Sequence, residues 1–127
     1  MGRGMPWREA RAVGDRGEDL ACAHLERMGW QLVERNWRCR QGEIDVVARD
    51  PDGELVFCEV KTRRLGSGEP FENLHPAKQE QVRRMAAAWL ALPSDRPWHD
   101  DLRFDAVGVL VDRRDALVRL DHLQGAF

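Results

Sequence analysis

The sequence lacks several features that would define its class. Its three cysteines (Cys22, Cys39 and Cys58) form no Cys-x-x-Cys pair, and an odd number closes no disulfide framework. Reduced thiols are typical of the cytoplasm, and we expect that location. The longest apolar run covers residues 85–92, whereas a membrane span needs roughly 20 residues. Residues 1–11 carry charges and no apolar stretch, so we expect no secretory signal there, and we expect no membrane partner.

The chain also lacks an excess of positive charge, and it is nearly devoid of lysine. Its 20 basic and 22 acidic residues give a net charge of −2, which excludes a global field that would coat DNA non-specifically. Any nucleic-acid partner would have to be held by a local basic surface. Only Lys61 and Lys78 are lysines. Because lysine offers a compact point charge that arginine does not, these two positions are candidates for function.

The length and composition predict one globular domain. The chain has 127 residues, of which 43% are hydrophobic and 33% charged. We expect a flexible N-terminal tail over residues 1–12 and a domain over 13–127. The apolar spacing predicts helices over 15–28 and 76–92, a loop over 63–73, and strands over 30–38, 43–49, 54–62, 102–111 and 117–123. This order, α-β-β-β-α-β-β, predicts a single α/β domain with a central mixed sheet flanked by helices.

The third predicted strand carries charge in an unusual place. Glu59 and Lys61 share one face of an otherwise apolar strand, where charged groups have a desolvation cost. In the preceding strand, Asp45 shares a face with Glu43. If these strands pair across the turn at 52–53, Asp45 and Glu59 converge near one end. Two carboxylates beside a lysine form a plausible site for a hard divalent cation, which prefers oxygen ligands.

Each predicted helix adds one charged candidate. Glu18 heads the apolar stripe of the first helix, so its carboxylate is expected to point toward the core or a cleft. Lys78 lies in the first turn of the second helix, where a positive charge opposes the helix dipole. A phosphate group bound at that N-terminus would relieve the conflict.

Three short segments contain these charged candidates: Gly17-Glu18, Gly42-Glu43-Ile44-Asp45 and Glu59-Val60-Lys61. Together they resemble the PD-(D/E)XK nuclease superfamily. The closest match is its YraN-type family of predicted bacterial endonucleases, which is related to archaeal Holliday-junction resolvases. The resemblance covers about residues 11–111, including Asn36 and Asp105, and it implies a restriction-endonuclease-like core.

The resemblance implies a role for each candidate residue. Asp45, Glu59 and the carbonyl oxygen of Val60 would bind Mg²⁺ or Mn²⁺. Lys61 would orient the attacking water, and Glu18 would hold a metal-bound water or position the site. Three basic residues would contact flanking phosphates: Arg63, Arg64 and Lys78. The implied function is that of a Mg²⁺-dependent endonuclease acting on branched or structured DNA in repair or recombination, and two symmetric nicks would suit a homodimer.

Simpler interpretations remain open from the sequence alone. Glu59 and Lys61 could form an ordinary ion pair on a solvated strand face, and Glu18 could be an acid favoured by the helix dipole. Lys78 could be a solvated lysine. Arginines around Trp37 could form a basic ridge, or Trp37 could simply be packed. At the level of function, the alternatives are a nucleic-acid-binding protein without cleavage activity and a hydrolase of small phosphate esters.

Overall fold

The computed structural model describes residues 7–72, 74–92 and 102–127. Two helices and five strands follow one another in the predicted order: α1 (Trp7–Arg27), β1 (Gln31–Cys39), β2 (Gly42–Arg49), β3 (Leu55–Arg64), α2 (Pro76–Leu90), β4 (Leu102–Val111) and β5 (Leu117–Leu123). Among the described residues no helix is both long and apolar enough to cross a membrane.

The five strands form one mixed sheet in the order β1-β2-β3-β4-β5. The pairs β1–β2, β2–β3 and β4–β5 are antiparallel, as expected for strands joined by short turns. The pair β3–β4 is parallel, because the chain crosses over through α2 between them. The prediction of a single α/β domain with a central mixed sheet is therefore confirmed.

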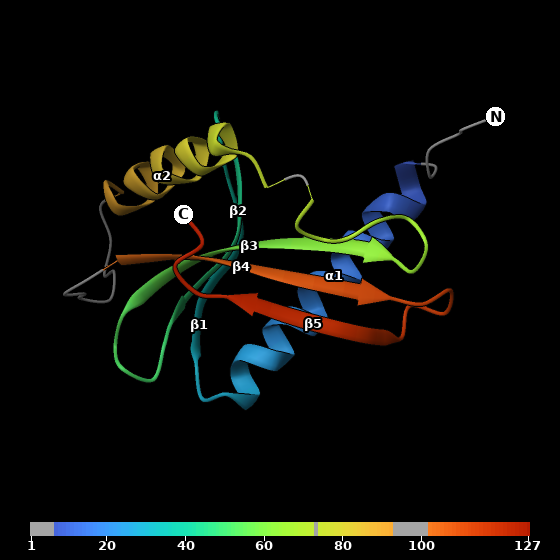
Figure 1. Ribbon diagram of the computed structural model, residues 1–127. Coiled ribbons are helices and arrows are strands. Elements are labelled where there is room, and N and C mark those ends of the chain that lie inside the picture. Colours follow the sequence, from blue (N-terminus) through green and yellow to red (C-terminus); the bar gives the residue numbers. More distant parts are fainter. Residues whose placement is uncertain (1–6, 73, 93–101) are drawn as a thin grey trace.

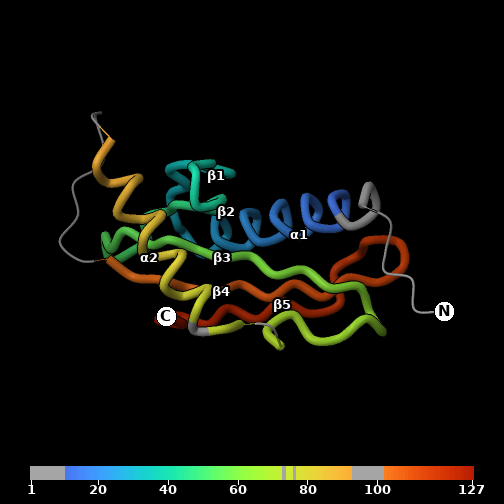
Figure 2. The backbone as a smooth tube through the Cα atoms, turned by 90° about the horizontal axis from the view of Figure 1, so that it is seen from above, coloured from blue at the N-terminus to red at the C-terminus, as the bar shows by residue number. Residues whose placement is uncertain are grey.

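One helix covers each face of the sheet. The alternation of β3 directs Val56 and Cys58 toward α1, and it directs Leu55 and Phe57 toward α2, where they pack against Trp89 and its neighbours. Figure 1 shows α2 across one side of the sheet and α1 passing behind β3, β4 and β5. From above, α1 runs beside β3 and β4 while α2 crosses the strands (Figure 2). This arrangement is consistent with a restriction-endonuclease-like core.

The start of α1 and the end of β3 differ from the predictions. We expected a tail over 1–12, but residues 7–12 are helical, while 1–6 lie outside the described residues. The helix continues through its glycines because Val13 is buried against β4, and this packing outweighs the low helix propensity of glycine. Arg63 and Arg64 were expected in a loop but belong to β3, since the parallel ladder with β4 continues to Arg64 and Val111.

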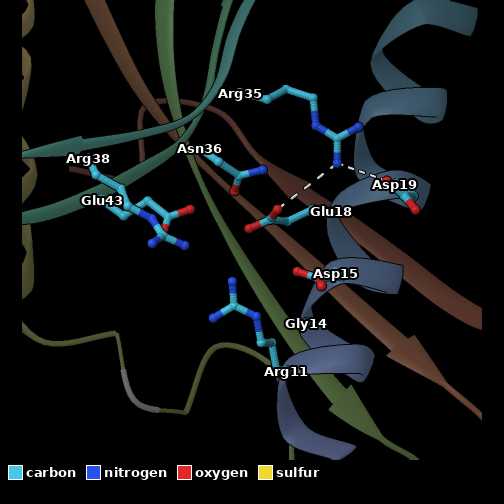
Figure 3. A pocket seen from close by; sticks show the side chains of 9 residues that line it. All are labelled: Arg11, Gly14, Asp15, Glu18, Asp19, Arg35, Asn36, Arg38 and Glu43. Carbon is cyan, nitrogen blue, oxygen red and sulfur yellow. Dashed lines mark hydrogen bonds and ion pairs between the residues drawn. The ribbon is translucent and has the colours of Figure 1, made fainter. Parts of the chain in front are cut away.

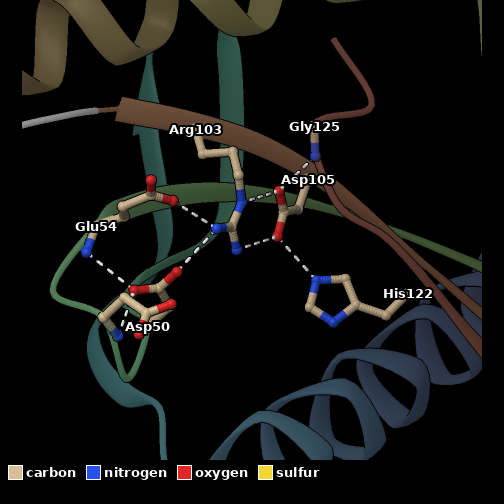
Figure 4. Close-up of polar contacts among 7 residues, drawn as sticks. Asp50, Glu54, Arg103, Asp105, His122 and Gly125 are labelled. Carbon is tan, nitrogen blue, oxygen red and sulfur yellow. Dashed lines mark hydrogen bonds and ion pairs between the residues drawn. The ribbon is translucent and has the colours of Figure 1, made fainter.

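A buried carboxylate joins β4 to the C-terminal segment (Figure 4). The side chain of Asp105 is fully buried and accepts hydrogen bonds from Arg103 Nε and Nη2 at 2.9 and 3.0 Å and from the Gly125 N–H at 3.0 Å. His122 Nε2 lies 2.8 Å from Oδ2, and because a carboxylate only accepts, this nitrogen carries the proton. Arg103 also pairs with two carboxylates near the β2–β3 turn, Asp50 and Glu54. Asp105 therefore has a structural role that the sequence did not reveal.

Candidate functional site

The candidate site lies where β2 and β3 stop pairing. Their antiparallel register ends at Val46 and Cys58. Asp45 precedes Val46 in β2, and its Oδ2 accepts a hydrogen bond from the N–H of Val60, two residues after Cys58, at 2.8 Å. This amide is therefore bound by a side chain in place of a β2 carbonyl, and Asp45 is fixed between the two strands.

Three carboxylates converge at this point. Glu18 comes from α1 and Glu43 from the start of β2, and one oxygen each of Glu18, Glu43 and Asp45 lie within 4.8 Å of one another. Oxygen ligands at such spacing suit Mg²⁺ or Mn²⁺, so the donor set fits the predicted cation. Glu43 was recognised from the sequence only as a neighbour of Asp45 on its face. Glu43 is two residues from Asp45 in the same strand, and this spacing could have identified it as a further site residue.

Glu18 reaches the cluster because α1 approaches β3 very closely at the preceding residue. A Cβ atom on Gly17 would overlap the side chain of Thr62, so only glycine fits between helix and strand. Thr62 is next to Lys61 in β3. The contact between Gly17 and Thr62 therefore sets the distance between α1 and β3 next to Glu18 and Lys61.

Replacing Gly17 with alanine is expected to destabilise the protein by about 1–3 kcal/mol, because the added methyl group forces α1 away from β3. Gly14 is a matched control in the same helix, since a Cβ there would meet nothing within 4 Å. Gly14→Ala should stabilise the protein by about 0.5–1 kcal/mol through helix propensity. Urea denaturation of both variants measures the difference. Equal effects would show that the close contact does not constrain the helix.

Glu59 binds both lysines of the chain. Its carboxylate is buried, and the same oxygen, Oε1, lies 3.4 Å from Lys61 Nζ and 3.3 Å from Lys78 Nζ. The alternative of a solvated strand face is therefore wrong for Glu59. Lys78 was predicted to contact phosphate, and the structure places its ammonium on Glu59 at the candidate site. The predicted role of the Val60 carbonyl oxygen as a metal ligand stays a prediction.

The electrostatics of the cluster favour protonated carboxyl groups. Burial and the nearby charge of Glu59 raise the pKa of Asp45 to about 8, although the hydrogen bond from Val60 opposes this shift. Burial and Glu43 raise the pKa of Glu18 above its ordinary value of 4.5. The hydrogen bond from the Val60 N–H places Asp45 next to the residue that follows Glu59 in β3. A bound cation would favour the ionised forms that burial disfavours.

A cavity of about 490 Å³ opens beside the carboxylates, between α1 and β1 (Figure 3). Arg35 pairs there with Asp19 at 2.8 Å and lies 4.0 Å from Glu18. Arg38 Nε lies 3.5 Å from Glu43. The cavity thus places basic groups against the acidic cluster, and its lining comprises Arg11, Gly14, Asp15, Glu18, Asp19, Arg35, Asn36, Arg38 and Glu43.

The other basic candidates lie further along β3, beyond Lys61. Arg64 forms an ion pair with Asp115 at 2.8 Å, in the turn between β4 and β5, and Arg63 precedes it in β3. Their predicted contacts with phosphate stay predictions. Trp37 packs against the core on the α2 side, which confirms the interpretation of a packed tryptophan, while Arg35 and Arg38 line the cavity.

The fold and the site describe an α/β protein with a central mixed sheet, consistent with a restriction-endonuclease-like core, and with a cluster of carboxylates suited to a divalent cation. The sequence profile of "Uncharacterised protein family UPF0102" matches residues 17–109. The chain belongs to this family, which confirms the YraN-type resemblance. Membership of the nuclease superfamily stays a prediction.

Relatives from several bacteria match nearly the whole chain. A UPF0102 protein of Streptomyces griseus is 50% identical over 115 residues, which cover 90% of this chain and 94% of the relative. One of Nocardia farcinica is 45% identical, covering 94% and 91%, and one of Geobacter sulfurreducens is 44% identical, covering 92% and 89%. Their names state the family and no activity.

Proposed function

We propose that the protein is a metal-dependent endonuclease that hydrolyses phosphodiester bonds in branched or otherwise structured DNA. The observation that carries this proposal is the convergence of three carboxylates from α1 and β2, one of which, Asp45, is bound by the Val60 N–H between Glu59 and Lys61 of β3. A lone acidic cluster is common on protein surfaces. This one lies at a break in strand pairing and beside a cavity, and Lys61 follows the residue whose N–H binds Asp45.

Each residue of the site has a task in this reaction. Asp45 would hold Mg²⁺ or Mn²⁺ together with Glu18 and Glu43, and Glu59 and the Val60 carbonyl would complete the ligands as the family resemblance implies. The cation supplies an acidified water molecule and offsets negative charge on the phosphate. Lys61, half-buried against Glu59, would hold its ammonium at the reacting phosphate and orient the attacking water.

The distribution of basic groups supports a polymeric substrate. Arg35 and Arg38 line the cavity beside the carboxylates, and Arg63 and Arg64 extend along β3 from Lys61. Contacts of this kind position a phosphate backbone without reading its bases. We further propose that the enzyme acts in the cytoplasm during repair or recombination, and that a homodimer supplies the two sites needed for paired nicks.

The test is a cleavage time course on labelled four-way junction, flap, single-stranded and linear duplex DNA with Mg²⁺ or Mn²⁺. Asp45→Asn protein, purified in parallel, controls for contaminating nuclease. Cleavage by the wild type alone, fastest on a branched substrate, is the expected result. Folded wild-type protein that binds junctions without cutting them would refute the enzyme and favour a binding role. Inhibition by small phosphate esters at low concentration would instead favour a small-molecule hydrolase.

A further inference from the structure

Asn36 has an unusual backbone conformation in the middle of a strand. Its φ angle is +54°, in the left-handed region that residues with a side chain seldom adopt. It lies within β1, where an extended conformation is the rule. Such conformations cost free energy and persist where the surrounding structure enforces them, often at functional sites.

The unusual residue lies opposite Asp45. The ladder between β1 and β2 pairs Arg35 with Val46 and Trp37 with Ile44, and the register places Asn36 across from Asp45 between these pairs. Neither Asn36 nor Asp45 is paired in the ladder. The left-handed residue of β1, Asn36, therefore lies opposite Asp45, the first residue of β2 beyond its pairing with β3.

The side chain of Asn36 points into the cavity beside Glu18 (Figure 3). Burial and the charge of Glu43 raise the pKa of Glu18, whereas the neighbouring Asn36 side chain acts to lower it. Asn36 thus lines the same cavity as Glu18 of α1 and lies across from Asp45 of β2. Both acids belong to the three-carboxylate cluster.

We infer that Asn36 is a positioning residue, whose left-handed backbone and side-chain amide hold Glu18 and Asp45 in the arrangement that a divalent cation requires. This inference rests on the proposed function. A purely structural explanation is that β1 needs a kink here, and glycine would satisfy that need at least as well as asparagine. Removing the amide group should therefore weaken cation binding if Asn36 positions the acids, and should leave it unchanged if β1 needs only the kink.

The experiment compares Asn36→Gly with Asn36→Ala. Glycine keeps the left-handed backbone and removes the amide, whereas alanine removes the amide and also disfavours the backbone. Binding of Mn²⁺ alone is followed by electron paramagnetic resonance, and thermal melting is followed in the metal-free state. We expect Asn36→Gly to melt at or above the wild-type temperature and to bind Mn²⁺ about 10-fold more weakly, as for lost partners of metal ligands. Asn36→Ala should lose both stability and affinity.

The outcomes separate this inference from the proposed function. Wild-type Mn²⁺ affinity in Asn36→Gly would overturn the positioning role, and so would a loss of stability greater than that of Asn36→Ala. Wild-type protein that binds Mn²⁺ but cuts none of the DNA substrates would refute the nuclease, while weaker binding by Asn36→Gly would still support the positioning role. Wild-type protein that neither binds Mn²⁺ nor cuts DNA would refute both.

Discussion

Replacing Asp45 with asparagine is expected to stabilise the metal-free protein near pH 8 and to abolish cation-dependent cleavage of DNA. Burial and Glu59 raise the pKa of Asp45 to about 8, whereas its ordinary value is 3.8. The folded protein therefore keeps a proton that the unfolded chain releases. Wild-type stability should fall as the pH rises from about 4 to about 8, by at most about 1.4 kcal/mol per pH unit.

Asparagine has the shape of aspartate but no proton to release, so Asp45→Asn should lose most of this pH dependence. Its amide oxygen can still accept the hydrogen bond from Val60. The raised pKa of Glu18 would leave a weaker slope of the same sign. Urea denaturation in EDTA near pH 5.5 and pH 8 measures the difference, with the larger gain expected at the higher pH. If Asp45→Asn were less stable than the wild type near pH 8, the ionised Asp45 carboxylate would not be the destabilising buried charge that we infer.

Added Mg²⁺ is the internal control. Near pH 8 it should restore stability to the wild type, because it favours the ionised carboxylate, and it should have little effect on Asp45→Asn. The same substitution removes several kcal/mol of transition-state stabilisation, or on the order of 10³-fold in cleavage rate. Equal stabilisation of both proteins by Mg²⁺ would place the cation away from Asp45.

Most of the fold could be predicted because local patterns agree with the tertiary structure. The alternation in β3 specifies which side chains face each helix, and β4 and β5 begin and end where their apolar patterns do. The start of α1 could not be predicted, since Gly14 and Gly17 weaken the helical pattern. Gly17 is required by a contact with Thr62, which is 45 residues away in the sequence.

The candidate site was predictable where residues are close in sequence or share a strand face. Glu59 and Lys61 share a face of β3 and form an ion pair, as strand alternation predicts. The predicted alternation of β2 is wrong at Asp45, since Ile44 packs on the α2 side of the sheet and Val46 on the α1 side. Other features depend on geometry that no local pattern contains. The pairing of Lys78 with Glu59 depends on the path of the chain between β3 and α2. The left-handed conformation of Asn36 lies inside a run that otherwise reads as a regular strand.

Asp105→Asn is expected to destabilise the protein by about 3–5 kcal/mol, as for the loss of one partner in a buried ion pair. The two oxygens of Asp105 accept from Arg103, His122 and the Gly125 N–H. Asparagine replaces one of these oxygens with an NH₂ group, which donates hydrogen bonds and cannot accept them. The buried donors that face this group would then have no acceptor. These contacts join β4, β5 and the C-terminal segment, and their loss should loosen all three.

Asp121→Asn provides a matched control. Asp121, like Asp105, lies two residues after an arginine on a strand, and it accepts a hydrogen bond from Arg119 Nε at 2.8 Å. The Arg119–Asp121 pair is exposed to solvent. An exposed pair contributes about 0–1 kcal/mol, so Asp121→Asn should be nearly neutral. Similar losses in the two variants would show that burial of Asp105 adds nothing to the strength of its contacts.

The pH dependence of Asp105 has the opposite sign to that of Asp45. Burial alone would raise the pKa of Asp105, but hydrogen bonds from His122, Arg103 and the Gly125 N–H together lower it below 3.8. Its contribution to stability is therefore present above about pH 4 and is lost as the pH falls through the lowered pKa. Acid unfolding followed by circular dichroism should show this loss in the wild type and not in Asp105→Asn. Parallel acid-unfolding curves that differ only by a constant offset would mean that Asp105 stabilises the sheet without its charge.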